Sequence, residues 1–174
     1  MKWAFSEKKP AGKGKKTFPA FLLLLLILCF PVHVLSANSF HDSRTLHSWL
    51  MLGKREFTVT FTHSVELTEV REIYRLESND IYLVETVFSS YGAGLPSTTS
   101  YPFEMTEDGF RIYDMHQKMD PLVYRTGAAR ANHRLVLGNR DIPFLEFSQP
   151  AEGVCFETKR IPLFIYLMKE IFNE

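Results

Sequence analysis

The sequence predicts an all-β domain, a sandwich or partly open barrel of short antiparallel strands, with a C-terminal helix. One observation is strict alternation in residues 56–62, where apolar side chains occupy every second position and threonines the rest. A second is a series of short apolar runs, separated by turn residues at a spacing of roughly ten residues. Hydrophobic residues make up 45% and aromatic residues 14% of the 174-residue chain, enough for one packed core.

The chain begins with a basic segment and an apolar run. Residues 1–20 carry six lysines against one glutamate, a net charge of +5, and FLLLLLILCF (21–30) and PVHVLSA (31–37) follow. A basic start before an apolar centre is typical of a secretory signal or of an uncleaved anchor. Triplets 34–36 and 35–37 offer small residues for cleavage, so both outcomes stay open.

Two regions are therefore expected. Residues 1–37 form a Lys-rich cytoplasmic start with a signal or anchor segment, and residues 38–174 form a single extracytoplasmic β-domain. The domain is membrane-anchored through residues 18–37 if the segment is uncleaved, and otherwise secreted. The body carries 14 basic and 19 acidic side chains. This mildly acidic balance argues against nucleic acid as a partner.

The body is next divided into elements. Residues 38–55 read as a polar lead-in, and strands are expected at 56–62, 70–76, 81–88, 110–113, 135–137, 144–147 and 153–158. Asp108-Gly109 marks a turn before the fourth of these. Residues 162–172 have helical spacing after Pro162 and are expected to cover one open end of the sheet. Cys155 reads as a strand thiol rather than a reactive one.

The stretch FTHSVELTEVREIY (61–74) concentrates polar side chains beside a strand, with His63, Ser64, Glu66 and Glu72 as candidates. A His63–Ser64 hydrolase is disfavoured, because adjacent strand residues point to opposite faces and no nucleophile elbow is present. The spacing also matches no established metal motif, so no metal or cofactor is predicted. A hydrogen-bonded, partly buried His/Glu pair is favoured instead.

A second dense stretch, RTGAARANHR (125–134), supplies Arg125, Arg130, Asn132 and His133. Guanidinium groups bind carboxylates in bidentate fashion, which leaves two interpretations open. One is a site for a carboxylate ligand. The other, favoured, is an internal brace in which Arg125 or Arg130 faces Glu66 or Glu72.

The segment GAGLP (92–96) resembles a phosphate loop only superficially. It lacks the Lys-Ser/Thr pair and the strand–helix frame that such a loop requires. Gly92, Gly94 and Pro96 are therefore predicted to form a structural turn.

Together these motifs resemble the small family catalogued as domain of unknown function 1850. The resemblance covers roughly residues 45–170 and is carried by four segments: THSVELT (62–68) with Val70 and Glu72, YGAGLP (91–96), GFRI (109–112) and RANH (130–133). It implies an exported protein often encoded beside tripartite ATP-independent periplasmic (TRAP) transporters of the TAXI type. It implies no enzymatic activity.

Three functional hypotheses follow. The first is an accessory domain of a TAXI-type TRAP uptake transporter, which contacts the permease or the solute receptor and is not an enzyme. The second is a small carboxylate-binding β-module. The third is an exported, metal-assisted enzyme built around His63 and Glu66.

Overall fold

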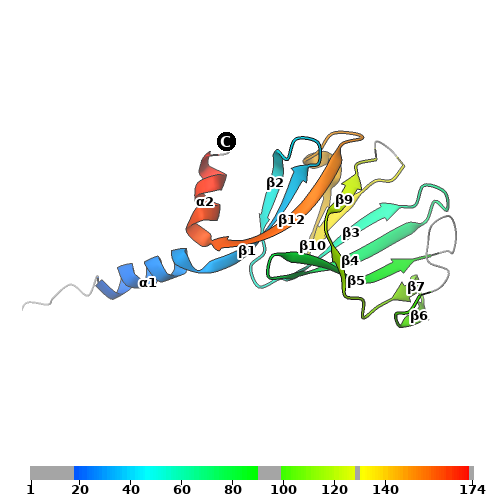
Figure 1. The fold of residues 1–174 in the computed structure, drawn as a ribbon, viewed down its shortest axis with the longest axis horizontal. Coiled ribbons are helices and arrows are strands. Elements are labelled where there is room, and N and C mark those ends of the chain that lie inside the picture. Colours follow the sequence, from blue (N-terminus) through cyan, green and yellow to red (C-terminus); the bar gives the residue numbers. More distant parts are fainter. Residues whose placement is uncertain (1–17, 90–98, 128–129, 173–174) are drawn as a thin grey trace, which may run out of the picture.

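The computed structural model describes residues 18–89, 99–127 and 130–172. Its described strands form two antiparallel sheets packed face to face, and helices lie at one end (Figure 1). This is a sandwich without a closed barrel, so the predicted fold class is confirmed. The predicted C-terminal helix is also present, as α2 (Leu163–Phe172).

The smaller sheet is built around the two ends of the described chain. Its strand order is β2 (Thr45–Leu50), β1 (Pro31–Ser39), β12 (Gly153–Pro162) and β9 (Leu122–Arg125). Strands β1 and β12 pair along their length, from Pro31 opposite Pro162 to Ser39 opposite Val154. The segments that precede β1 and follow β12 therefore leave the sheet side by side.

The larger sheet carries the first predicted polar stretch and the end of the second. Its order is β11 (Arg140–Pro143), β10 (Arg134–Leu137), β3 (Glu56–Thr62), β4 (Glu69–Glu77), β5 (Asp80–Phe88), β7 (Gly109–Ile112) and β6 (Phe103–Thr106), with β8 (Gln117–Met119) also paired to β5. Strand β3 has the bounds that its alternation predicts.

The core fills the space between the sheets. Leu35, Ala37 and Val154 from the smaller sheet are fully buried, as are Val59 and Leu135 from the larger one. Burial of such side chains is the main favourable term in folding. On the outer face of the larger sheet, ion pairs account for the arginines interleaved in 70–76. Arg75 pairs with Glu56 of the neighbouring β3 at 2.8 Å, and Arg71 pairs with Asp108 of the turn between β6 and β7 at 2.7 Å.

Three expectations about the bounds or the type of an element are wrong. Residues 31–37, expected in the leader, form most of β1 at the centre of the smaller sheet, so the β-domain begins at Pro31 and not at Asn38. The expected lead-in also contains β2. The expected strand at 144–147 is the 3₁₀ turn η1 (Phe144–Glu146), which follows Pro143 and buries Phe144.

The helices project from the end of the smaller sheet at which β1 begins and β12 ends (Figure 1). Helix α1 (Phe18–Cys29) precedes β1, and α2 follows β12. No side chain of α2 is buried, so α2 is not a lid on the core, contrary to the expectation that it covers an open end. Within the part of the chain that the structure describes, no helix is both long and apolar enough to cross a membrane.

Candidate functional site

The two predicted polar stretches meet at one end of the sandwich. Strands β3 and β10 pair with Thr60 opposite Arg134. Beyond that pair, the Thr62 N–H donates to the Ala131 carbonyl at 2.7 Å. The ring of His133 stacks on Phe61 with 5.4 Å between centroids. The two stretches are therefore in contact in the fold.

The β3–β4 connection is a tight turn in which His63 has a structural role. The His63 N–H donates to the Thr68 carbonyl at 2.8 Å, and the Leu67 N–H donates to the His63 carbonyl at 3.0 Å. The Glu66 N–H donates to Nδ1 of the imidazole at 3.2 Å. His63 therefore satisfies backbone donors of its own turn, as short polar side chains do in other turns. This bond involves the backbone of Glu66, so the predicted pairing of the histidine with a glutamate side chain stays a prediction.

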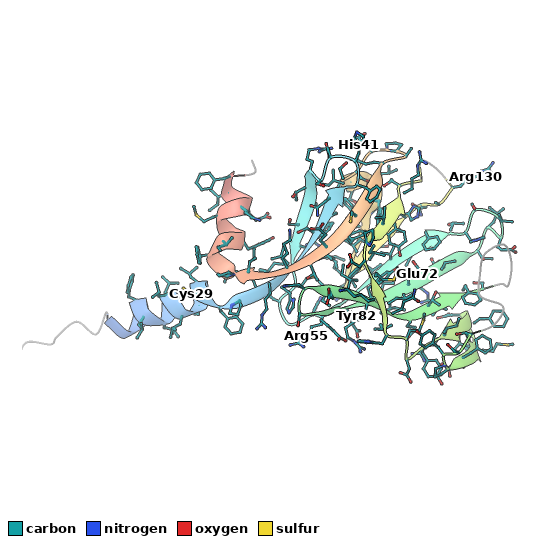
Figure 2. All side chains as sticks on the ribbon, in the orientation of Figure 1. Cys29, His41, Arg55, Glu72, Tyr82 and Arg130 are labelled. Atoms are coloured by element: carbon teal, nitrogen blue, oxygen red, sulfur yellow. The ribbon has the colours of Figure 1, made fainter. Side chains whose placement is uncertain are left out.

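The outer side of this turn is exposed and partly apolar. Val65 and Leu67 are 62% and 66% exposed, and Leu67 has a positive φ of 56°. We define the tip surface as the exposed side chains of this turn and of the adjoining segment that passes Thr62: Ser64, Val65, Leu67, Arg130 and Asn132. Figure 2 places Arg130 at the end of the molecule far from Cys29 of α1.

Glu72 lies on the inner side of the same sheet. Strand β4 alternates so that Val70, Glu72, Tyr74 and Leu76 point inward. The hydroxyl of Tyr74 donates to Oε2 of Glu72 at 3.0 Å, and the Tyr124 hydroxyl also donates to that oxygen. Since Tyr124 belongs to β9, this contact joins the two sheets.

The predicted arginine brace is therefore wrong for Glu72. Its carboxylate is bonded by Tyr74 and Tyr124 and not by Arg125 or Arg130. Arg125 instead donates from Nε to the Ala151 carbonyl at 3.3 Å. Because β9 alternates, Tyr124 points inward while Arg125 remains exposed. A tyrosine and not an arginine therefore faces Glu72 from β9.

The two tyrosines are held in their protonated form. Burial raises the pKa of Tyr74, and the neighbouring Glu72 charge adds to the rise. Burial also raises the pKa of Tyr124, with Tyr74 and Glu72 as further causes. Both phenols therefore stay neutral donors at neutral pH, and the Glu72–Tyr74–Tyr124 group forms a hydrogen-bonded connection between the sheets.

His133 lies in an aromatic setting beside this group. Its ring is 5.7 Å from Tyr124 and 5.4 Å from Phe144 between centroids, and the Gly127 N–H donates to Nδ1 at 3.3 Å. Burial lowers the pKa of His133, which favours the neutral ring that this acceptor role requires. His133 supports the tip surface from below and is not part of it.

The arginines at this end differ in their partners. Arg134 donates from Nε to Asp141 at 2.7 Å. Arg125 and Arg130 are exposed, and the ion pairs found among residues 18–89, 99–127 and 130–172 include neither of them. Both side chains therefore carry no charged partner among the described residues, although Arg125 also donates from Nε to the Ala151 carbonyl.

Several predicted features need separate mention. Gly92, Gly94 and Pro96 lie outside the described residues, so their predicted turn stays a prediction. No group of three or more His, Cys, Asp or Glu side chains suited to a metal ion occurs within the described ranges. Cys155 lies on β12, as predicted, and burial raises the pKa of its thiol.

Tyr74 and Tyr124 are not among the residues predicted from the sequence. Tyr74 is in phase with Val70 and Leu76, so its inward direction was readable from the alternation. Its meeting with Tyr124, 50 residues away, depends on packing of one sheet on the other. No local pattern carries that information.

Comparison with known proteins gives one family. The family model DUF1850, a domain of unknown function, matches residues 57–144. The matched range contains the turn after β3, the inward face of β4 and the segment that carries Arg130 to His133. Searches of curated proteins and of solved structures returned no match.

Proposed function

The chain belongs to the DUF1850 family, a domain of unknown function, and from that premise we propose a role for it as a membrane-anchored, extracytoplasmic accessory domain. In this proposal, its tip surface contacts another protein, the permease or solute receptor of a TAXI-type TRAP uptake transporter. The basic, apolar start of the chain supplies the anchor. The role is contact rather than catalysis.

The observation that supports this proposal best is the tip surface itself. Val65 and Leu67 are large aliphatic side chains that remain more than 60% exposed on a hydrogen-bonded turn. Exposed apolar groups rimmed by polar ones are typical of protein–protein contact sites. The turn and α1 lie at opposite ends of the long axis (Figure 1), so an anchored domain presents this surface away from its anchor.

The interior of the sandwich favours a rigid surface. The Thr62–Ala131 hydrogen bond fixes the two tip segments to each other, and His133 packs beneath them between Phe61 and Phe144. A surface that is ordered before binding loses less conformational entropy on association. This arrangement suits a docking surface of small area.

A crosslinking experiment tests the proposal. A tagged chain is crosslinked in membranes and purified, and co-purified permease or receptor is identified by mass spectrometry. We expect the double variant Val65→Asp/Leu67→Asp to lose the partner while still folding. The matched control is Met105→Asp, which is 75% exposed on β6 and outside the tip surface. Recovery of neither transporter component, or equal recovery with both variants, would contradict the proposal.

A carboxylate-binding module is the second candidate, favoured by Arg125 and Arg130. Both guanidinium groups are exposed and outside the ion pairs described above. Thermal unfolding against a panel of small organic acids tests this candidate. A true ligand at 100 times its dissociation constant adds about 2.7 kcal/mol to the free energy of unfolding. The stabilisation should disappear in Arg130→Gln and persist at a raised salt concentration. If an inorganic salt at the same ionic strength gives the same shift in thermal unfolding, the site is rejected.

A further inference from the structure

Helix α2 exposes its apolar side, whereas an ordinary surface helix buries that side against the protein. Its large apolar side chains recur at helical spacing on one side, and they are 41–74% exposed: Phe164, Leu167, Met168, Ile171 and Phe172. A helix on a globular protein normally directs such a stripe toward the core. Here the stripe points away from the protein.

The polar side of α2 faces the protein instead. Tyr166, Lys169 and Glu170 line a groove of about 710 Å³ against the outer face of the smaller sheet, together with residues of β1 and β2. Groove residues such as Ser36 and His47 are polar and suit this side of the helix. The orientation of α2 is therefore consistent with its surroundings, and its apolar side needs an apolar environment from outside the chain.

The position of α1 indicates what that environment is. Its side chains from Phe21 to Ile27 are all large and apolar, and all are 46–67% exposed. Helix α1 is apolar on every side, and the sequence before it carries six lysines against one glutamate. An apolar helix next to a basic segment matches a bilayer with anionic headgroups better than it matches a protein groove.

The start of α2 is tied to the end of α1. The Leu163 N–H donates to the Phe30 carbonyl at 3.0 Å, and Pro31 lies opposite Pro162 in the β1–β12 ladder. The first residue of α2 therefore lies next to the residue that follows α1. If α1 is embedded in lipid, α2 must start at the membrane surface.

We propose that α2 is an interfacial helix that lies on the bilayer beside α1, with its stripe from Phe164 to Phe172 inserted among the lipids. The inference depends on the anchoring included in the proposed function and adds a second membrane contact. Two attachments at one end of the sandwich restrict its tilt and hold the tip surface at a set distance from the bilayer. The polar groove then faces the protein side of the helix.

Environment-sensitive labels test this arrangement on the full-length chain. With Cys29 and Cys155 replaced by serine, single cysteines are introduced by Leu24→Cys on α1, Met168→Cys on the stripe and Lys169→Cys on the groove side. Each is labelled with the fluorophore NBD and reconstituted into phosphatidylcholine/phosphatidylglycerol vesicles. We expect blue-shifted emission, and quenching by a nitroxide-labelled lipid, at positions 24 and 168 but not at position 169.

The outcomes separate the two proposals. A lipid signal at position 24 without one at position 168 overturns the interfacial helix and leaves the anchor in place. A signal at neither position overturns the anchor as well. A signal at position 168 that grows with the protein-to-lipid ratio shows that a second copy of the chain covers the stripe, which also overturns the inference. Met105→Cys, at the exposed surface of β6, is the unshifted control for all cases.

Discussion

Glu72 is a partly buried carboxylate placed between two sheets, and two phenols donate to it. Burial of a charged group is unfavourable without hydrogen bonds, and Tyr74 and Tyr124 both donate to Oε2 of Glu72 from opposite layers. This contact contributes to the relative position of the sheets beneath the tip surface. The contribution of this contact to the free energy of unfolding belongs to the hydrogen-bonded group as a whole and not to any one of its three residues.

Truncation of this carboxylate tests the connection. We expect Glu72→Ala to lower the free energy of unfolding by about 1–3 kcal/mol for each hydroxyl left without its acceptor. Tyr124→Phe should cost much less in the Glu72→Ala background than in the wild-type chain, because the two residues share one interaction. Glu69→Ala, an exposed position on the same strand, should change stability by less than about 0.5 kcal/mol. Urea unfolding of the four variants measures these values, and additive effects would contradict the coupling.

Alkaline pH should weaken the domain through the same tyrosines. Because the pKa values of Tyr74 and Tyr124 are raised in the folded state, the folded chain keeps protons that the unfolded chain releases above the ordinary tyrosine pKa of about 10. This stability is fully present below that pH and falls as pH rises, by up to about 1.4 kcal/mol per pH unit for each tyrosine. The double variant Tyr74→Phe/Tyr124→Phe should flatten the loss between pH 9.5 and 11.5, and Tyr82→Phe should not. Thermal melts across this range provide the measurement; equal slopes in all three chains would refute it.

At the scale of elements, most strands are predicted by the sequence, whereas β1 is recognised only from its pairing in the fold. The alternation in 56–62 and the runs at 81–88 and 135–137 predict strands that the structure contains almost residue for residue. PVHVLSA is equally strand-like, but it directly follows an apolar run, and local composition does not separate a leader from a strand. Only the pairing of β1 with β2 and β12 makes that distinction.

The candidate site divides in the same way. Ser64, Arg130 and Asn132 of the tip surface are among the residues predicted from the sequence, because polar residues near a turn are visible there. Val65 and Leu67 are not among them, because their exposure depends on the turn geometry. The partner predicted for Glu72 is wrong, since the choice between Arg125 and Tyr124 depends on which of two neighbouring residues faces inward on β9. Long-range packing decides that orientation, and the four-residue strand is too short to show its phase.

The new boundary makes a direct prediction about truncated chains. A chain of residues 31–174 should fold, whereas a chain of residues 38–174 should not, because it lacks the strand between β2 and β12. Leu35 and Ala37 are fully buried, and full burial of a leucine side chain alone contributes about 1.5–3 kcal/mol. Against a typical domain stability of about 5–15 kcal/mol, loss of the whole strand is not tolerable.

Circular dichroism melts of the two truncated chains check this expectation. A cooperative transition is expected for residues 31–174 only, and the substitution Leu35→Asp in that longer chain should abolish it. N-terminal sequencing of the mature protein provides an independent readout. A mature N-terminus at residue 37 or 38, on a chain that still unfolds cooperatively, would show that β1 is dispensable.

At the scale of the whole molecule, the two ends of the long axis differ, which gives the molecule a structural polarity. The apolar helices lie at one end and the tip surface at the other, with the sandwich between them (Figure 1). The Glu72–tyrosine group and the half-buried His133 stiffen the end that is proposed to bind. The separation of anchor and contact surface gives the proposed accessory role its physical basis, since a partner can reach the tip surface without displacing the membrane contacts.

This polarity predicts which side of the membrane each end occupies. The lysines before α1 should remain in the cytoplasm by the positive-inside rule, and the tip surface should lie outside. In spheroplasts of cells expressing the chain with Cys29 and Cys155 replaced by serine, Ser64→Cys should react with a membrane-impermeant maleimide. Lys16→Cys should react only after lysis.

Replacement of Lys13, Lys15 and Lys16 by glutamate should reduce the fraction of Ser64→Cys that is labelled before lysis, because the charge asymmetry that sets orientation is then reversed. Labelling of Lys16→Cys and protection of Ser64→Cys in intact spheroplasts would place the body in the cytoplasm, where contact with an extracytoplasmic receptor is impossible.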